Sequence, residues 1–314
     1  MRAIRVGVCA VSLAAAMIGA PAAADQDSPS PQDRAPVFRA GADVVSVDAS
    51  VQNNRRPVTG LRATDFELLD NGVPQEITEI AYEKLPIDVT FLLDISASVT
   101  GSVLDELRKA LRQVRADLGP GDRLRLLIFN MRVRRLVDFT QPASDLDSAL
   151  ASLQGAGSSA VLDGLAVALT AADAPGRRRL IVLFSDGQDS SSISDVDTLL
   201  EVARRSTLTV AIVLGSPSAP DRPSSMLRTT SASTIATVGA LSDRIARETG
   251  GMVTVVSPGE NLTSKFRRML QDFRSSYVLY FTPLGVERSG VHTLDVRVKR
   301  SGVDVRARRG YVWR

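Results

Sequence analysis

Three short runs of oxygen-bearing side chains have the composition of a metal site. Asp94, Ser96 and Ser98 alternate along the run DISAS. Ser159 lies in the run GSSA, and Asp186 stands immediately before a glycine. Carboxylate and hydroxyl oxygens are hard ligands that suit Mg²⁺, Mn²⁺ or Ca²⁺, with water molecules completing the coordination shell. The three runs therefore predict a divalent-cation site, provided that the fold brings them together.

The residue counts exclude several other chemistries. The 314-residue chain has one histidine, His292, and one cysteine, Cys9. These counts cannot supply a His/Cys zinc site or a disulfide, and they leave no histidine near the oxygen-bearing runs for a Ser-His-Asp relay. A formal net charge of +3 is too small to indicate a nucleic-acid-binding surface. With only 4% aromatic residues, the core must be built mainly from Val, Leu, Ile and Ala.

Each run stands at the end of a predicted buried strand or just before a helix. Residues 87–94 and 179–185 are apolar almost throughout, which is typical of parallel strands that are buried on both faces. Ser159 precedes a helix predicted to begin near Leu162. In an open α/β sheet, ligand sites form beyond the carboxyl ends of the strands. We therefore expect the oxygen-bearing side chains to meet at one rim of a parallel sheet.

Strands alternate with helices from residue 84 to residue 276. Further strands are predicted at 124–129, 208–214 and 251–256, with an edge strand near 132–138. Helical spacing occurs at 103–114, 144–153, 162–172, 196–206, 241–249 and 261–275, and residues 216–236 indicate a long surface insertion. This alternation predicts a three-layer α/β domain with a doubly wound, mostly parallel, Rossmann-like sheet.

Period-two patterns flank this domain over residues 36–83 and 277–314. Val45, Val47 and Val51 alternate with polar residues in the first segment, and Leu294 and Val296 do so in the second. Each segment is too short to enclose a core alone, and the ends of a domain usually lie close together. We expect one small β-sandwich into which the α/β domain is inserted. The alternative is a pair of separate hairpins that pack on the α/β domain.

The first 24 residues have the pattern of a signal peptide. Two arginines precede an apolar run over 6–19, and small residues then suggest cleavage near Ala24. The apolar run is shorter than the ~20 residues that span a bilayer, although an uncleaved anchor is the alternative. Residues 25–35 are polar and proline-rich, and predict a flexible linker. The sequence thus predicts a secreted or periplasmic protein without a transmembrane segment after cleavage.

Together the oxygen-bearing residues resemble the metal-ion-dependent adhesion site (MIDAS) of von Willebrand factor type A (VWA) domains. The resemblance implies that Ser96, Ser98 and Ser159 bind the metal directly, and that Asp94 and Asp186 bind it directly or through water. It also implies an open coordination place for an acidic group of a protein partner. The family usually has threonine where this chain has Ser159, so the hydroxyl is kept but the methyl group that fixes the loop is missing.

The flanking segments resemble a second, more specific group, the VWFA-related proteins first grouped from Acidobacteria. The matching runs are 58–61, 65–66, 71–75 and 308–311. These are exported proteins of unassigned function, so the resemblance implies a family and adds no activity.

The leading hypothesis is an exported binding module that uses a divalent ion to engage a carboxylate of a protein partner, in adhesion or assembly, with no catalysis and no nucleic acid. The alternatives are a metal-dependent hydrolase that uses Asp94 and Asp186, and a structural protein with a vestigial metal site. Smaller features have structural interpretations: His292 as a packed strand residue, Asn261 as a helix N-cap, and the arginines at 177–179 as a solvated charge run.

Overall fold

The computed structural model describes residues 44–313, apart from 84, 171–175, 216–231 and 258–259. The predicted signal peptide, the linker and most of the predicted surface insertion lie outside these residues. The described residues belong to one compact unit. Within them, no helix is both long enough and apolar enough to cross a membrane.

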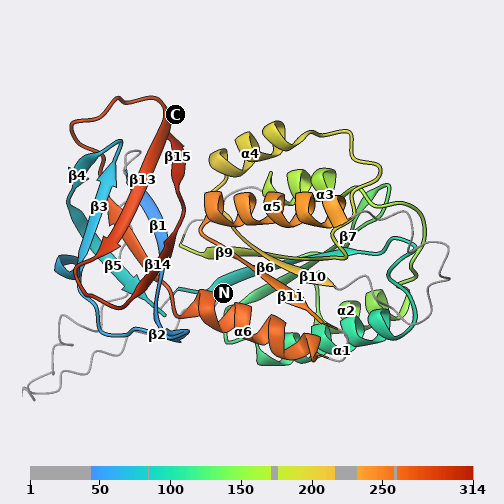
Figure 1. Cartoon of the computed structure of the whole chain (residues 1–314). Coiled ribbons are helices and arrows are strands. Elements are labelled where there is room, and N and C mark those ends of the chain that lie inside the picture. The colour runs from blue at the N-terminus through green and yellow to red at the C-terminus, as the bar shows by residue number, and fades with distance from the viewer. Residues whose placement is uncertain (1–43, 84, 171–175, 216–231, 258–259, 314) are drawn as a thin grey trace, which may run out of the picture. The chain divides into compact units, whose positions relative to one another are not determined.

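A six-stranded sheet with the order β11–β10–β9–β6–β7–β8 forms the centre of the α/β part (Figure 1). Its strands are β6 (Ile87–Asp94), β7 (Arg123–Phe129), β8 (Val133–Val137), β9 (Arg178–Ser185), β10 (Thr209–Gly215) and β11 (Met252–Val256). Neighbouring strands are parallel except for β8, which runs antiparallel to β7 at the edge. This sheet confirms the predicted α/β fold and the predicted edge strand, which the structure shows to be antiparallel.

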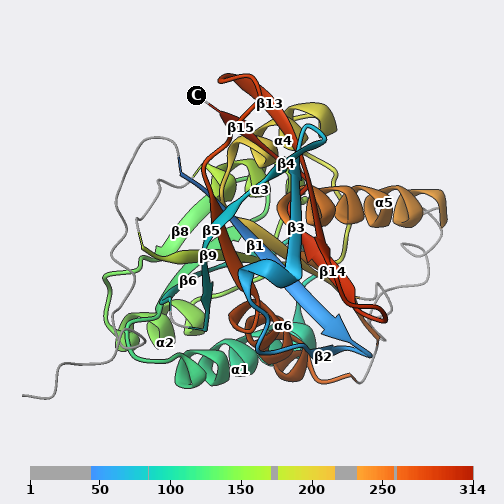
Figure 2. The ribbon, with the colours of Figure 1, turned by 90° about the vertical axis from the view of Figure 1, so that its left-hand side faces the viewer.

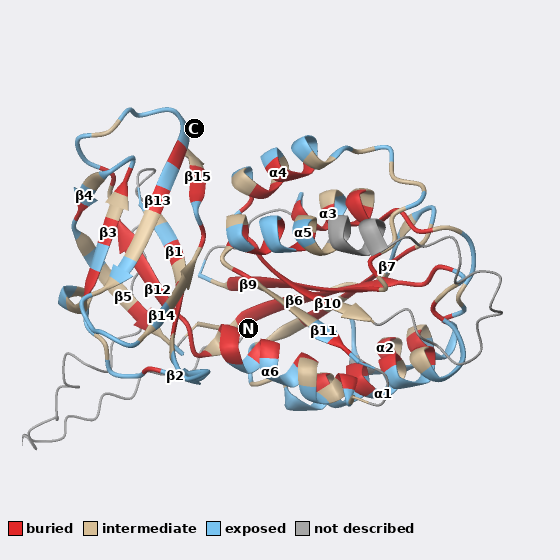
Figure 3. Ribbon diagram, in the orientation of Figure 1, coloured by how far each residue is buried: buried red, intermediate tan, exposed pale blue. Residues whose placement is uncertain are grey.

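Helices cover both faces of this sheet. They are α1 (Gly101–Asp117), α2 (Ala143–Ala151), α3 (Val161–Leu169), α4 (Val196–Arg205), α5 (Ala232–Thr249) and α6 (Leu262–Arg274). α1, α2 and α6 share one hydrophobic cluster with the sheet, and α3, α4 and α5 share a second. Every residue of β6 and β9 is buried between the two clusters, as Figure 3 shows.

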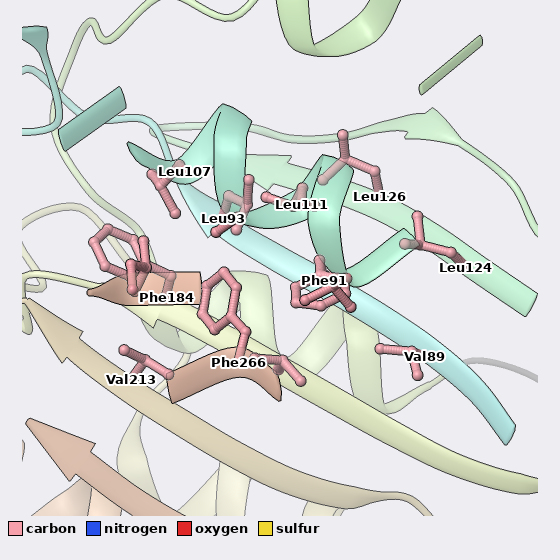
Figure 4. Packing of buried hydrophobic residues seen from close by; sticks show 14 of the residues in the cluster. Val89, Phe91, Leu93, Leu107, Leu111, Leu124, Leu126, Phe184, Val213 and Phe266 are labelled. Atoms are coloured by element: carbon pink, nitrogen blue, oxygen red, sulfur yellow. The ribbon is translucent and has the colours of Figure 1, made fainter. Parts of the chain in front are cut away.

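The alternation of side chains along β6 divides its residues between the two clusters. Phe91 and Leu93 belong to the cluster beneath α1 and α6, whereas Leu92 belongs to the opposite one. Phe91 packs against Phe266 of α6 with 5.2 Å between ring centroids (Figure 4). Packing on both faces leaves β6 little freedom, so its last residue, Asp94, is held at a fixed position on the rim.

α5 begins at Ala232, earlier than the predicted start at Leu241. The helix therefore includes residues 232–236, which the sequence analysis assigns to the surface insertion. The run from Ala232 to Ala236 is ASTIA, in which serine and threonine favour turns and caps over helix interiors. Local preference is a weak guide to helix boundaries, and the continuing helix overrides it here.

The strands before and after the α/β part pair with one another in two sheets (Figure 2). The N-terminal strands are β1 (Val45–Asn53), β2 (Arg56–Pro57), β3 (Phe66–Asp70), β4 (Val73–Gln75) and β5 (Ile77–Tyr82), with a 3₁₀ turn at Ala63–Asp65. The C-terminal strands are β12 (Tyr277–Phe281), β13 (Gly290–Val298), β14 (Asp304–Ala307) and β15 (Gly310–Trp313). One sheet has the order β14–β1–β12–β5, with β2 paired to β1, and the other has the order β15–β13–β3–β4.

Side chains from both of these sheets share a third hydrophobic cluster. Val47 and Leu279 come from one sheet, and Phe66, Leu68 and Leu294 come from the other. Because each of the two sheets contains both N-terminal and C-terminal strands, neither flanking segment forms this cluster alone.

His292 and Asn261 have the predicted structural roles. His292 lies in β13 with only 1% of its surface exposed, which confirms the packed strand histidine. Asn261 is the N-cap of α6 and accepts a hydrogen bond from the backbone N–H of Ser264 at 3.0 Å, which confirms the cap.

The prediction that the arginines at 177–179 are a solvated charge run is wrong. Arg178 and Arg179 are only 5% and 7% exposed. The Nε of Arg178 donates to Asp48 of β1 at 2.8 Å, and its guanidinium lies 4.2 Å from the centre of the Phe273 ring. Arg177 pairs with the buried Asp88. These partners lie far from residues 177–179 in sequence, so the run of arginines alone could not predict that its side chains are buried.

Candidate functional site

Asp94 is the last residue of β6, and the structure buries it completely. Its Oδ1 accepts the backbone N–H of Ser96 at 2.8 Å. Its Oδ2 accepts the hydroxyl of Ser159 at 2.8 Å and that of Ser185 at 2.7 Å. The carboxyl group of Asp94 therefore joins three segments of the chain at the carboxyl rim of the sheet.

Two opposing effects act on the ionisation of this carboxyl group. Burial raises the pKa of Asp94 above its ordinary value, because an anion is poorly solvated there. Hydrogen bonds from Ser96 and Ser185 lower that pKa, whereas the nearby charge of Asp186 raises it further. The net result is a raised pKa, which is the electrostatic signature of a buried carboxylate without a neighbouring cation.

The turn after β6 places two further hydroxyl groups side by side. The Oγ atoms of Ser96 and Ser98 are 3.0 Å apart, with Ser96 buried and Ser98 half-buried. The backbone N–H of Val99 donates to the carbonyl of Ser96 at 2.9 Å, which closes the turn. The turn that follows Asp94 thus holds the hydroxyl groups of Ser96 and Ser98 within hydrogen-bonding distance of each other.

A tight loop carries Ser159 to the same place. The N–H of Ala156 donates to the carbonyl of Ile95 at 2.8 Å, and the N–H of Ala97 donates to the carbonyl of Gly157 at 2.9 Å. A side chain at Gly155 could not fit, because its Cβ would lie 2.1 Å from the carbonyl oxygen of Val99. The loop is therefore fastened directly to the turn that holds Ser96 and Ser98.

Asp186 follows β9, the neighbour of β6 in the sheet. It is half-buried, and its Oδ1 accepts the backbone N–H of Gln188 at 3.1 Å. The next residue, Gly187, has a φ of +81°, which a glycine adopts without strain. Since β6 and β9 are neighbouring parallel strands, Asp94 and Asp186 both lie at the carboxyl rim, and the charge of Asp186 raises the pKa of Asp94. All five residues singled out from the sequence therefore converge at this rim.

Sequence reasoning missed Ser185, although it directly precedes Asp186. Ser185 is fully buried; its hydroxyl donates to Asp94 and accepts the N–H of Gly187 at 3.0 Å. The local signal was a serine at the end of the most strongly apolar strand of the chain. A polar residue at such a position requires a hydrogen-bonding partner, and Asp94 provides it.

The loop after Asp186 also supports the site in a way the sequence analysis did not anticipate. Asp189 accepts the N–H of Leu162 at 2.9 Å and the hydroxyl of Ser192 at 2.6 Å. The N-cap residue of α3, Ala160, has no side-chain cap, so a carboxylate from another segment satisfies the start of this helix. Ser190 donates its N–H to the carbonyl of Ser159 at 2.8 Å. The sequence feature that could have indicated this role is the run of polar residues DGQDSSS at 186–192.

The donor set fits a hard cation bound by both carboxylates and hydroxyls. Among the described residues, no group of three or more His, Cys, Asp or Glu side chains could hold a metal. The hydroxyl of Ser159 directs its hydrogen at Asp94, which leaves oxygen lone pairs free for a cation. Asp94 and Asp186 would supply negative charge, and hydroxyl oxygens suit Mg²⁺, Mn²⁺ or Ca²⁺ better than softer metals.

Several solved structures have a fold similar to that of this chain. A von Willebrand factor type A protein from Catenulispora acidiphila is 13% identical, with 88% of this chain and 75% of that chain covered and a TM-score of 0.48. BatB from Bacteroides thetaiotaomicron is 13% identical, with 60% and 98% covered and a TM-score of 0.46. Proximal thread matrix protein 1 from the mussel byssus, with zinc in its MIDAS motif, is 13% identical, with 64% and 48% covered and a TM-score of 0.46.

The sequence itself also matches a family. Residues 88–239 match the von Willebrand factor type A domain. The match begins in β6, extends through β9, and thus contains the whole cluster around Asp94. The carboxylate and hydroxyl groups at the carboxyl rim lie within this match, whereas β11 and α6 follow its last residue. Residues 88–239 of this chain are therefore similar in sequence to a von Willebrand factor type A domain.

Proposed function

We propose that this protein is an exported, non-catalytic binding module that uses a divalent cation to engage a carboxylate of a protein partner, in adhesion or assembly. The proposed ligands are Asp94, Ser96, Ser98, Ser159 and Asp186. The observation that carries the proposal is the convergence of carboxylate and hydroxyl oxygens at the carboxyl rim, centred on the fully buried Asp94.

The hydrogen bonds around Asp94 support this proposal because they fix the positions of the oxygen atoms and leave lone pairs on the serine hydroxyls. Ser159 and Ser185 both donate to Oδ2, so their oxygens keep lone pairs. Burial raises the pKa of Asp94 because its anion is poorly solvated, so a positive charge nearby would stabilise the ionised carboxylate. A bound Mg²⁺, Mn²⁺ or Ca²⁺ ion would supply that charge and an open coordination place for the partner's carboxylate.

A binding role is favoured over hydrolysis by the position of the proton-transfer groups. The chain has a single histidine, and it is buried in β13, where its Nδ1 lies 2.8 Å from Asp70. Among the proposed ligands, only Asp94 and Asp186 could transfer a proton, and both would be engaged with the ion. We therefore propose interaction and not turnover as the function.

We also propose that residues 36–83 and 277–314 form one β-sandwich, into which residues 84–276 are inserted as the VWA domain. The pairing of β1 with both β12 and β14, and of β3 with β13, supports this organisation. Export rests on the sequence of residues 1–24, which has the pattern of a cleaved signal peptide. The mature protein would then begin at Asp25, in the periplasm or outside the cell.

Thermal unfolding of the mature chain, residues 25–314, tests the metal site directly. A ligand that binds only the folded state at a hundredfold excess over its dissociation constant stabilises that state by about 2.7 kcal/mol. Melting curves should therefore shift upward with Mg²⁺, Mn²⁺ or Ca²⁺ and return with a chelator. A matched pair of variants, Asp186→Ala at the site and Asp304→Ala on exposed β14, should separate specific binding from general charge effects.

The shift should disappear in Asp186→Ala and persist in Asp304→Ala. Absence of a shift with all three ions in the unmodified protein would eliminate the proposed metal site. An equal shift in both variants would place the ion elsewhere on the protein.

A further inference from the structure

Two exposed apolar side chains lie on opposite sides of the Asp94 cluster. Met131 is 60% exposed and follows β7, whereas Ile193 is 94% exposed and follows β9. In the order β9–β6–β7, these strands lie on either side of β6, which ends in Asp94. Adjacent strands are about 4.8 Å apart, so the segments carrying Met131 and Ile193 leave the sheet on both sides of the proposed ion.

The backbone around Ile193 is fastened, so this side chain is not free to turn inward with the loop. The N–H groups of Ile193 and Ser194 donate to the carboxylate of Asp163 at 3.0 and 2.8 Å. Two residues earlier, Ser191 donates its N–H to the carbonyl of Ser159 at 3.0 Å. The loop thus presents a nearly fully exposed isoleucine two residues after Ser191, which is hydrogen-bonded to the backbone of the proposed ligand Ser159.

Asp163 shows how firmly this loop is held. Burial acts to raise the pKa of Asp163, but hydrogen bonds from Ile193 and Ser194 outweigh it, so the pKa lies below its ordinary value. The carboxylate of Asp163 is therefore occupied by this loop and is not offered to a partner.

Met131 is positioned from the other side by the loop that carries Ser159. The side-chain amide of Asn130 donates to the carbonyl of Ala156 at 2.9 Å, which ties the turn after β7 to that loop. A Cβ at Gly157 would lie 3.8 Å from the sulfur of Met131, so the methionine lies directly beside the loop. Met131 therefore lies beside the loop that carries the proposed ligand Ser159.

The charged residues next to Met131 indicate the sign of the charge that a bound partner would carry there. Arg132 and Arg134 are exposed in and beside β8, the edge strand next to β7. Asp138, the acidic residue that follows β8 at its other end, is engaged by Arg125 and Arg135 at 3.1 and 3.0 Å. The surface on this side of the site thus combines an exposed thioether with positive charge, which complements an acidic partner.

We propose that the partner segment presents a metal-binding carboxylate flanked by apolar side chains, which pack on Met131 and Ile193, with additional acidic residues toward Arg132 and Arg134. This inference rests on the proposed function and specifies the chemistry of its partner. Coordination alone would accept any exposed Asp or Glu. The two apolar contacts would restrict binding to acidic residues in an apolar context, because burying such side chains adds affinity only for segments that match them.

Selection from a random displayed-peptide library tests this inference with no partner sequence assumed. The mature protein is loaded with Mg²⁺, and bound peptides are released with a chelator. We expect released peptides to be enriched in Asp or Glu with Leu, Ile, Val, Met or Phe within two positions. A synthetic peptide of the enriched sequence should bind about tenfold or more tightly than its copy with serine at the apolar positions.

Variants of the protein identify the surface that makes this distinction. Met131→Ser and Ile193→Ser should each weaken binding of the selected peptide by about tenfold or more, while the ion-dependent melting shift remains. Leu284→Ser is the matched control, because this leucine is 66% exposed and follows β12 in the other part of the protein. Leu284→Ser should bind as the unmodified protein does.

The outcomes distinguish this inference from the proposed function. If the ions shift the melting curve but released peptides show no apolar enrichment, or if both serine variants bind normally, the inference is overturned and the metal site stands. Failure to select any chelator-released peptide with a protein that binds the ion would also overturn it. Absence of any ion-dependent melting shift would instead remove the proposed function on which the inference rests.

Discussion

The hydroxyl of Ser159 donates a hydrogen bond to Oδ2 of Asp94 across 2.8 Å, joining the loop before α3 to the end of β6. Both residues are almost fully buried, so water cannot replace this bond when it is lost. A loop residue whose neighbours are all small is thereby held against the central strand of the domain.

Ser159→Ala should destabilise the ion-free protein by about 1–3 kcal/mol, because Asp94 loses one of its buried donors. It should also weaken the ion-dependent stabilisation. Ser159→Thr keeps the hydroxyl and should retain both properties. Denaturant unfolding with and without Mg²⁺ measures the two effects, and Ser144→Ala on the exposed side of α2 is a suitable control. Equal stability of the unmodified protein, Ser159→Ala and Ser159→Thr would contradict a role for the Ser159 hydroxyl.

Asp186→Ala and Asp94→Ala should differ in the ion-free protein although both abolish the response to ions. Asp186 is half-buried beside Asp94, so its removal relieves repulsion and should leave stability unchanged or slightly higher. Removal of Asp94 leaves the buried hydroxyls of Ser159 and Ser185 without their acceptor, which should cost about 1–3 kcal/mol per unsatisfied group. Chelator-treated samples compared by denaturant unfolding would show this asymmetry, and equal effects would refute it.

Asp48→Ala should be strongly destabilising, because it leaves the buried guanidinium of Arg178 without its carboxylate partner. Breaking a buried ion pair by removing one partner costs about 3–5 kcal/mol. The double variant Asp48→Ala with Arg178→Met should recover part of this loss, since the unpaired charge is then removed. A double-mutant cycle measured by denaturant unfolding gives the coupling between the two residues. If the two substitutions have additive effects on the free energy of unfolding, the ion pair between Asp48 and Arg178 does not stabilise the contact between β1 and β9.

Acidification should weaken the start of α4. The backbone N–H of Thr198 donates to Asp195 at 2.7 Å and holds the pKa of Asp195 below its ordinary value. A lowered folded-state pKa gives stability that is fully present above the ordinary value and is lost as the pH falls through the folded value. Asp195→Asn can still cap the helix but has no charge to titrate. The stability difference between the two proteins should therefore shrink as the pH falls below the ordinary pKa of an aspartate, and a difference that is constant with pH would contradict this cause.

Deletion of residues 25–83 should expose the C-terminal strands. β1 pairs with β12 and β14, and β3 pairs with β13, so the deletion removes hydrogen-bonding neighbours from three strands at once. Unpaired strand edges and exposed apolar faces favour aggregation and cleavage. Limited proteolysis should cut within 277–314 in the deleted protein, while residues 84–276 remain protected by their own helices. Equal protection of the C-terminal strands in the full and deleted proteins would contradict the proposed β-sandwich.

The sequence alone determined the central strands and the residues that converge at their rim. Residues 87–94 and 179–185 are apolar enough to be recognised as buried strands, and parallel strands place their carboxyl ends on one edge. Asp94 and Asp186 could therefore be assigned to the same edge of the parallel sheet from the sequence alone. The same reasoning predicted the edge strand near 132–138 and the cap at Asn261, because turn and cap preferences depend on neighbours in sequence.

Only the tertiary structure decided which groups hold the site together. Ser185 shares Asp94 with Ser159, and Asp189 caps α3 from a different segment, although each residue taken alone has an ordinary local interpretation. The burial of Arg178 against Asp48 likewise depends on a contact between residues 130 positions apart. Hydrophobic periodicity predicts which face of a helix or strand is buried. It does not predict which polar group from a distant part of the chain will contact a polar residue on that face. That pairing is fixed when the elements pack, because a buried polar group must find a partner in three dimensions.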